Sequence, residues 1–391
     1  MSSPGSQMLE AIDAARLLDT ALRLVEVQSW TGQAGDAADR LAQILEEDGF
    51  EVQRPEADWP AAPAVVVRFD TGRAGPILQF DGHLDTVHLP FVPPRVQDGV
   101  LHGSGAADMK GGLAVIVEAM RVLRDTGSLP CGQLLFTAHD HHEAPWGDGR
   151  QLEALIRAGF VGDAVLIPEY LCDRLAIVGR GGAVFQIDVR RDGEPVHEML
   201  GGIEQTDVIA AGADLVMRIK ALDRQLAAHT DSVAGRESVF VGLCQGGEIY
   251  NQSPVSARIE GTRRWLPGAD REAIGRQFDA LLAEVARDHG VQVEGSCQTV
   301  REAFQLDEKH PFVSDFQSAH EQIVGRVLPT GAKAVLDDGN TFFHHAGIPA
   351  ITHGPNATGA HTLDERVPVS ELVRTTKVYV QTAMNYCGAR C

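Results

Sequence analysis

Two kinds of hydrophobic pattern alternate along the first 178 residues. Apolar residues recur at helical spacing over residues 11–27, 36–50 and 111–127. Short apolar or β-branched runs, bounded by Gly and Pro, cover residues 63–69, 75–83, 133–140 and 163–169. The first pattern predicts amphipathic helices and the second predicts buried strands. Strands that alternate with helices are typical of a layered α/β fold with a mostly parallel sheet.

The pattern changes near residue 179. Polar and apolar residues alternate with period two over 181–193 and 238–268, and helical spacing covers 205–223 and 271–290. This order of strands and helices predicts an inserted α+β domain. The α/β pattern then returns and ends in a helix over 369–387. We therefore expect one domain from 1–178 and 298–391, and a second from 179–297.

Composition narrows the classes of function. A chain of 391 residues with 44% apolar and 23% charged residues is typical of a globular protein of two domains. A net charge of −20 opposes nucleic acid or an anionic membrane as partner, because both attract basic surfaces. No targeting segment or membrane span is expected. The six cysteines are scattered without a CxxC pair, which favours reduced thiols and a cytoplasmic protein.

Two short motifs carry candidate chemistry. His83 and Asp85, in "FDGHLDTV", follow an apolar strand directly, and ligands gather at strand ends in α/β sheets. Residues two apart in extended backbone point to the same face, so both side chains can share one site. Asp108, in "GSGAADMKGG", lies between glycines where a helix begins. Taken separately, each motif also fits a structural role, such as a helix N-cap for Asp108.

In combination the motifs are more specific. "GHLDTV", "GSGAADMKGG", "IPEYLCDRLAIVGRGG" and "GAHTLDERVPVSEL" follow one another over nearly the whole chain. The chain thus resembles the dinuclear zinc family of aminoacylases, acetylornithine deacetylases, succinyl-diaminopimelate desuccinylases and glutamate carboxypeptidases, metallopeptidase family M20. The resemblance implies a zinc-exopeptidase-like catalytic domain with a mostly parallel sheet. It also implies a ferredoxin-like inserted domain that serves as lid and dimerisation domain.

The resemblance implies a ligand set for two divalent metals. His83 and Glu169 would bind the first metal, Asp108 would bridge both, and His361 would bind the second. Asp85 would stand behind His83 and raise its basicity. Imidazole and carboxylate ligands suit zinc, and also cobalt or manganese. We expect zinc, with the occupancy of the second site open.

The resemblance extends to the inserted domain. His197 would stabilise the oxyanion, often across a homodimer formed through the lid, and Asn251 and Arg264 would contact the substrate, typically its carboxylate. An arginine fork pairs both oxygens of a carboxylate. Asn340 would lie near the site from the first domain. A solvated histidine, a turn asparagine and a surface arginine remain alternatives at these positions.

The segment "HDHHE", residues 139–143, departs from the family pattern of two adjacent acids, a general base followed by a metal ligand. An ungapped match puts Asp140 at the base position and His141 at the ligand position. A match on the acid puts His142 and Glu143 there instead. We favour Glu143 as the proton acceptor, with Asp140 as the alternate base and either histidine as a nitrogen ligand. In the second match Glu143 occupies the usual ligand position, so its role stays open.

These features predict a metal-dependent hydrolase that cleaves an amide-type C–N bond with activated water. An N-acyl amino acid, a dipeptide or a related small carboxylate fits as substrate. The alternative is a non-catalytic homologue that binds metal or ligand after losing the usual acid pair. A phosphoesterase is disfavoured because the sequence has no glycine-rich phosphate loop.

Overall fold

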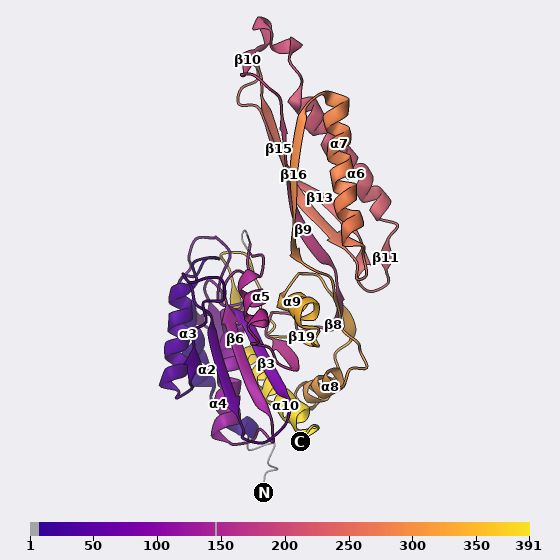
Figure 1. Ribbon diagram of the computed structural model, residues 1–391. Helices are drawn as coiled ribbons and strands as arrows, with labels where there is room; N and C mark the ends of the chain where they lie inside the picture. Colours follow the sequence, from indigo (N-terminus) through magenta and orange to yellow (C-terminus); the bar gives the residue numbers. More distant parts are fainter. Residues whose placement is uncertain (1–7, 145–146) are drawn as a thin grey trace. The chain divides into compact units, whose positions relative to one another are not determined.

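The computed structural model describes residues 8–144 and 147–391 (Figure 1). The chain divides into two compact units, one from Met1–Ile177 with Phe304–Cys391 and the other from Val178–Ala303. The hydrophobic pattern predicts these boundaries at 178/179 and 297/298. The lid and dimerisation roles of the second unit stay predictions.

A six-stranded sheet forms the centre of the first unit. Its order is β1 (Val52–Gln53), β2 (Val65–Asp70), β6 (Gln133–His139), β3 (Ile77–His83), β7 (Ala164–Ile167) and β19 (Ala350–Thr352). The pairs β6–β3, β3–β7 and β7–β19 are parallel, whereas β1–β2 and β2–β6 are antiparallel. The predicted α/β fold with a mostly parallel sheet is confirmed.

Helices pack around this sheet (Figure 1). They are α2 (Ala14–Val25), α3 (Gly35–Glu47), α4 (Lys110–Asp125), α5 (Arg150–Arg157), α8 (Pro311–Val324), α9 (Asp338–Thr341), the π-helical η3 (Phe342–Ala346) and α10 (Val369–Gly388). The central helix α4 is buried over most of its length and contacts α2, α10 and β3. Leu78 and Phe80 of β3 join the core that includes these helices.

The alternate positions of β3 carry polar residues instead. Successive strand residues point to opposite faces, so Gln79, Asp81 and His83 share the face opposite to Leu78 and Phe80. All three polar side chains are fully buried. Buried polar side chains are costly unless they have partners, so this face of the sheet is a candidate for a functional site.

Two three-stranded sheets complete this part of the chain. One has the order β17 (Phe304–Gln305), β8 (Leu175–Gly179) and β18 (Thr330–Lys333), and the other has β20 (Arg366–Pro368), β5 (Val100–His102) and β4 (Arg95–Gln97). The second of these joins the segment after His361 to the segment before Asp108 through the register Arg366↔His102. It thereby fixes two loops that carry candidate ligands.

The second unit is an antiparallel α+β sandwich. Its sheet has the order β13 (Ser238–Gly246), β15 (Ser256–Trp265), β9 (Gly181–Arg190) and β16 (Gln292–Arg301), and its long helices are α6 (Val208–Leu226) and α7 (Arg271–His289). Short elements are β10 (Val196–His197), η1 (Glu198–Leu200), η2 (Gly202–Glu204), β11 (Thr230–Asp231), β12 (Gly235–Arg236) and β14 (Gln252–Ser253). The chain order β9–α6–β13–β15–α7–β16 is that of a ferredoxin-like domain, as predicted.

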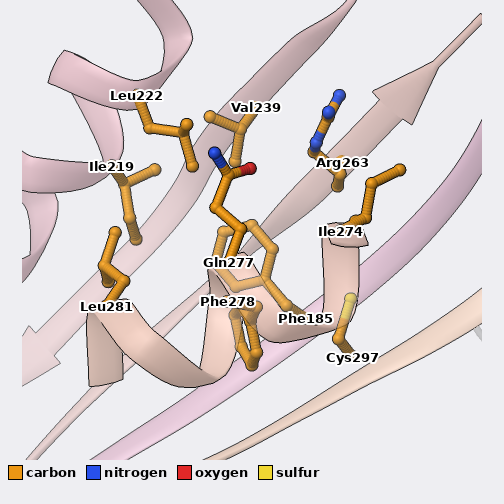
Figure 2. Close-up of a pocket in the computed structure, with 10 residues that line it drawn as sticks. All are labelled: Phe185, Ile219, Leu222, Val239, Arg263, Ile274, Gln277, Phe278, Leu281 and Cys297. Atoms are coloured by element: carbon orange, nitrogen blue, oxygen red, sulfur yellow. The ribbon is translucent and has the colours of Figure 1, made fainter. Parts of the chain in front are cut away.

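A mostly apolar pocket lies between the two long helices and the sheet of this unit (Figure 2). Phe185 and Phe278 meet there, with Ile219 and Leu281 from the two helices. Arg263 and Gln277 are the charged and amide side chains at its wall. The pocket is a packing gap of the helix–sheet core and holds no cluster of candidate ligands.

One pair of cysteines differs from the sequence expectation of reduced thiols. Cys131 and Cys391 form a disulfide with a Cα–Cα distance of 5.6 Å, and Cys387 beside them is a buried free thiol. The two partners are 260 residues apart in the chain. Their pairing depends on α10 returning beside the strand that follows Cys131, which no local spacing reveals.

Candidate metal centre

The candidate residues of the first unit gather at the carboxyl ends of its parallel strands. His83 is the last residue of β3, and Glu169 follows β7 by two residues. Asp108 lies just before α4, and His361 lies in the loop before β20. The loops that follow the strands lie at this edge, and ligands of α/β proteins usually bind to side chains of these loops.

His83 is held in one orientation. Its Nδ1 lies 2.9 Å from the backbone carbonyl oxygen of Asp85, so Nδ1 donates and Nε2 is free to face the site. That Nε2 lies 3.1 Å from Asp108 Oδ1 and 3.4 Å from Glu169 Oε1. Burial and the Asp108 carboxylate raise the pKa of Glu169 to about 7. One imidazole therefore faces two buried carboxylates.

Asp108 lies between two histidines. Its second oxygen, Oδ2, is 3.3 Å from His361 Nε2, and the same nitrogen lies 3.0 Å from Glu143 Oε1. Hydrogen bonds to Asp108 and Glu143 raise the pKa of His361 to about 10. The centre thus has two halves that share Asp108, with His83 on one side and His361 on the other.

The side chains of the "HDHHE" segment diverge. Asp140 turns away from the centre, and its carboxylate accepts the backbone N–H groups of Gly32 at 2.8 Å, Ala34 at 3.1 Å and His141 at 2.6 Å. The His141 ring packs edge-on against Trp59, with ring centroids 4.3 Å apart. The structure does not bring Asp140 or His141 to the cluster around Asp108.

His142 and Glu143 do reach the centre. Both backbone N–H groups donate to the Asp85 carboxylate, at 3.1 Å and 2.8 Å, which fixes the turn that carries them. His142 Nδ1 lies 2.9 Å from Asp338 Oδ1, and its ring stacks on His83 with centroids 4.0 Å apart. His142 and Glu143 are the residues that the match on the acid puts at the base and ligand positions. Which of the two roles each residue has stays a prediction.

The donor set fits divalent transition cations. His83, His142 and Glu169 place one donor atom each within 4.8 Å of one another, and so do His83, Asp108 and Glu143. A cation with bonds of about 2.0–2.1 Å holds tetrahedral ligand atoms about 3.3–3.4 Å apart. The nitrogen–oxygen distance of 3.4 Å from His83 to Glu169 fits that spacing, and the distance of 3.1 Å from His83 to Asp108 is slightly shorter.

Three predicted residues lie in the second unit. His197 Nε2 lies 3.0 Å from the Asn251 side-chain amide, so the structure brings these two together. Arg264 is half-buried, and burial and the nearby Arg180 lower its pKa. Among the residues that the structure describes, its guanidinium has no hydrogen bond or ion pair. In the first unit, Asn340 is buried, and its side chain accepts the N–H of Asp337 in a capping box.

Several residues around the centre have no local sequence signal that predicts them. Glu365 Oε2 accepts the N–H groups of Ala107 and Asp108 at 3.2 and 3.3 Å and so fixes the Asp108 loop. Asp338 orients His142 from α9. No local spacing links these residues, because 258 residues separate Glu365 from the loop that it holds.

Comparison with known proteins places this geometry in a family. Residues 80–385 match the model of peptidase family M20/M25/M40. The chain belongs to this family. Succinyl-diaminopimelate desuccinylase of Maricaulis maris is 28% identical over 96% of both chains. N-formyl-4-amino-5-aminomethyl-2-methylpyrimidine deformylase of Bacillus subtilis is 21% identical over 93% of this chain and 90% of its own.

A solved structure shares the fold. YXEP of Bacillus subtilis, described as a dinuclear metal-binding peptidase of family M20, superposes with a TM-score of 0.70 over 95% of this chain and 97% of its own, at 17% identity. The chain is therefore a metal-dependent hydrolase of amide-type C–N bonds, as the sequence predicted. No comparison supports the non-catalytic alternative.

Proposed function

We propose that this hydrolase cleaves the amide bond of a small N-acylated amino acid, or of a dipeptide, that carries a free carboxylate. The observation that carries the proposal is Asp108, whose two oxygens face His83 and His361. A shared carboxylate between two imidazoles is the arrangement that two cations need in order to act on one water and one carbonyl.

Each half of the centre has its own ligands. His83, Glu169 and His142 would hold the first cation together with Asp108, and His361 would hold the second. We propose zinc, because imidazole and carboxylate donors at this spacing suit it and thiolates are absent among the ligands named. When bound, the two cations lower the pKa of a water molecule and polarise the substrate carbonyl.

Glu143 is the proposed proton acceptor. Burial and the Asp108 carboxylate raise the pKa of Glu143, which brings it toward the range of an effective general base. Its carboxylate takes the proton of the attacking water and returns it to the leaving amine. Asp85 holds this group in place through the Glu143 N–H. Asp140, the alternate base, already accepts three backbone N–H groups.

Arg264 is the proposed anchor of the substrate carboxylate. Its guanidinium is half-buried beside Arg180, and a carboxylate would relieve the repulsion between the two cations. His197 and Asn251 would contribute polar contacts to the oxyanion and the substrate. A succinyl or amino-acid carboxylate fits this anchor, whereas a formyl-pyrimidine substrate offers none. Asn340 stays a proposed neighbour of the site.

The second unit is the proposed dimer interface. Large apolar side chains are exposed on it, with Met199 76%, Leu200 79% and Tyr250 98% exposed. Such residues are typical of surfaces that another chain covers. Light scattering on the purified protein should give the mass of two chains. A cytoplasmic location stays a prediction. None of the helices in residues 8–144 and 147–391 is long and apolar enough to cross a membrane.

A substrate panel tests the proposal. The zinc-reconstituted protein is offered N-succinyl, N-acetyl and N-formyl amino acids, dipeptides, and the matching amides without a carboxylate, and the released amine is measured. Turnover confined to substrates with a carboxylate is expected. The chelated protein serves as the control. Equal turnover of the carboxylate-free amides would contradict the role of Arg264.

A further inference from the structure

A second cluster of ligand-type side chains lies next to the metal centre. Asp81 on β3, His139 at the end of β6 and Asp338 on α9 are each 0% exposed. In the parallel register Asp81 pairs with Thr137 and His83 with His139, so two neighbouring strands present this cluster on the same face. Their donor atoms lie within 4.8 Å of one another.

Two atoms of this cluster lack hydrogen-bond partners among the residues that the structure describes. They are His139 Nε2 and Asp81 Oδ2, which lie 3.5 Å apart. His139 Nε2 also lies 3.3 Å from Asp338 Oδ2. His139 Nδ1 lies 3.1 Å from the carbonyl oxygen of Asp140, so Nδ1 carries a proton. In the neutral ring, the lone pair of Nε2 therefore faces two buried carboxylates. These acceptors repel one another unless a proton or a metal cation lies between them.

A proton on Nε2 accounts poorly for the distances. Charge-assisted N–H···O bonds are about 2.7–2.9 Å long, shorter than either contact of Nε2. The observed 3.3 and 3.5 Å instead fit the spacing of about 3.3–3.4 Å between ligand atoms of a tetrahedral cation.

Charge favours a cation as well. Asp81 and Asp338 bring two carboxylates into a cluster that is 0% exposed, and burial of unbalanced charge is costly. A divalent cation balances the two carboxylates. The nearby Lys333 does not supply the missing charge, because its ammonium group pairs with Asp337 at 2.5 Å.

The geometry points to a third divalent cation, bound by Asp81, His139 and Asp338 behind the catalytic pair. Three protein ligands leave one tetrahedral position for water. Asp338 would connect this site to catalysis, because its other oxygen accepts the Nδ1 proton of His142 and so directs Nε2 of that ring toward the first catalytic cation. The cation at this site would have a structural and orienting role. This inference does not depend on which amide is the substrate.

Metal content tests this inference without any substrate. The protein is reconstituted with Zn²⁺, freed of excess metal by gel filtration and measured by mass spectrometry of the elements. Wild type is expected to hold three zinc ions per chain and Asp81→Asn one fewer, while the exposed control Asp70→Asn keeps the wild-type content. Equal zinc content in Asp81→Asn and wild type would overturn the inference.

Release kinetics give a second readout that does not need a core variant. The catalytic centre opens to solvent at His361, whose side chain is 51% exposed, whereas the third site is fully buried. Chelator is therefore expected to remove the catalytic ions fast and one ion slowly. His361→Ala should keep the slow ion. Release of all metal from the wild-type protein in a single fast phase would refute the third site. This result would not affect the proposed amide hydrolysis.

Discussion

The variant Asp140→Asn distinguishes two roles for Asp140 in the "HDHHE" segment, that of a loop anchor and that of the general base. The carboxylate of Asp140 accepts three backbone N–H groups, two of them from the loop at Gly32 and Ala34. The asparagine removes the charge and places an NH₂ group against at least one of these donors. If Asp140 only holds the loop, the variant loses stability and keeps its chemistry. If Asp140 were also the base, the variant would lose its chemistry as well.

The expected losses in stability and in turnover are large enough to distinguish the two roles of Asp140. A hydrogen bond to a charged group contributes roughly 1.5–3 kcal/mol, and its neutral counterpart about 1 kcal/mol. One lost bond and two bonds that each lose about 0.5–2 kcal/mol therefore lower the free energy of unfolding by roughly 2.5–7 kcal/mol. At roughly 2–4 °C per kcal/mol for large domains, this lowers Tm by at least about 5 °C. Removal of a general base would instead slow turnover by about 10²–10⁴-fold.

The assay combines thermal unfolding with amide hydrolysis by the zinc-loaded protein, well below the Tm of the variant. We expect a lower Tm, wild-type zinc content and a kcat within about tenfold of wild type. Asp19→Asn, an exposed carboxylate on α2, is the matched control and should change neither quantity. A folded variant with wild-type zinc content and a loss of a hundredfold or more in kcat would refute the assignment of Asp140.

Three further predictions concern other parts of the site. Asp85→Asn should weaken zinc binding by about 10–100-fold in a chelator competition, because its carboxylate fixes both His142 and Glu143 through their N–H groups; unchanged affinity would contradict this role. His361 is protonated below about pH 10 in the metal-free protein, so zinc must displace its proton and affinity should rise with pH between about 6 and 9. Calorimetry in buffers of different ionisation enthalpy measures this proton release, which should be smaller in His361→Ala because only the other ligands then release protons. Arg264→Gln should raise KM for a carboxylate substrate by about 10–100-fold, equivalent to the roughly 1.5–3 kcal/mol of a charged hydrogen bond, with kcat little changed; a drop in kcat with constant KM would argue against an anchor.

Much of the fold is predictable from local patterns. The strand over Ile77–His83 and the helix over Lys110–Asp125 lie where their apolar runs and spacing predict them. His83 and Asp85 adjoin a strand end, and Asp108 adjoins a helix start, as expected. These features depend on residues close in sequence, so periodicity is sufficient to find them.

The register of "HDHHE" is not predictable in this way. The strand ends at His139, and His141 has a left-handed φ of 66°, so the alternation of faces stops where the assignment depends on it. The partners of Asp140 lie 108 and 106 residues earlier, and Asp338 lies 196 residues after His142. Contacts of this range appear only once the chain is folded.

The central claim is that Glu143 transfers protons at a centre held by other residues. Glu143→Gln keeps the shape of the side chain and removes the basic oxygen, so the zinc content of this variant and its turnover of the best amide substrate test the claim together. We predict wild-type zinc content and a loss of about 10²–10⁴-fold in kcat. Normal hydrolysis by the variant would contradict the claim, and the loss of one zinc ion per chain would show that Glu143 is a ligand instead.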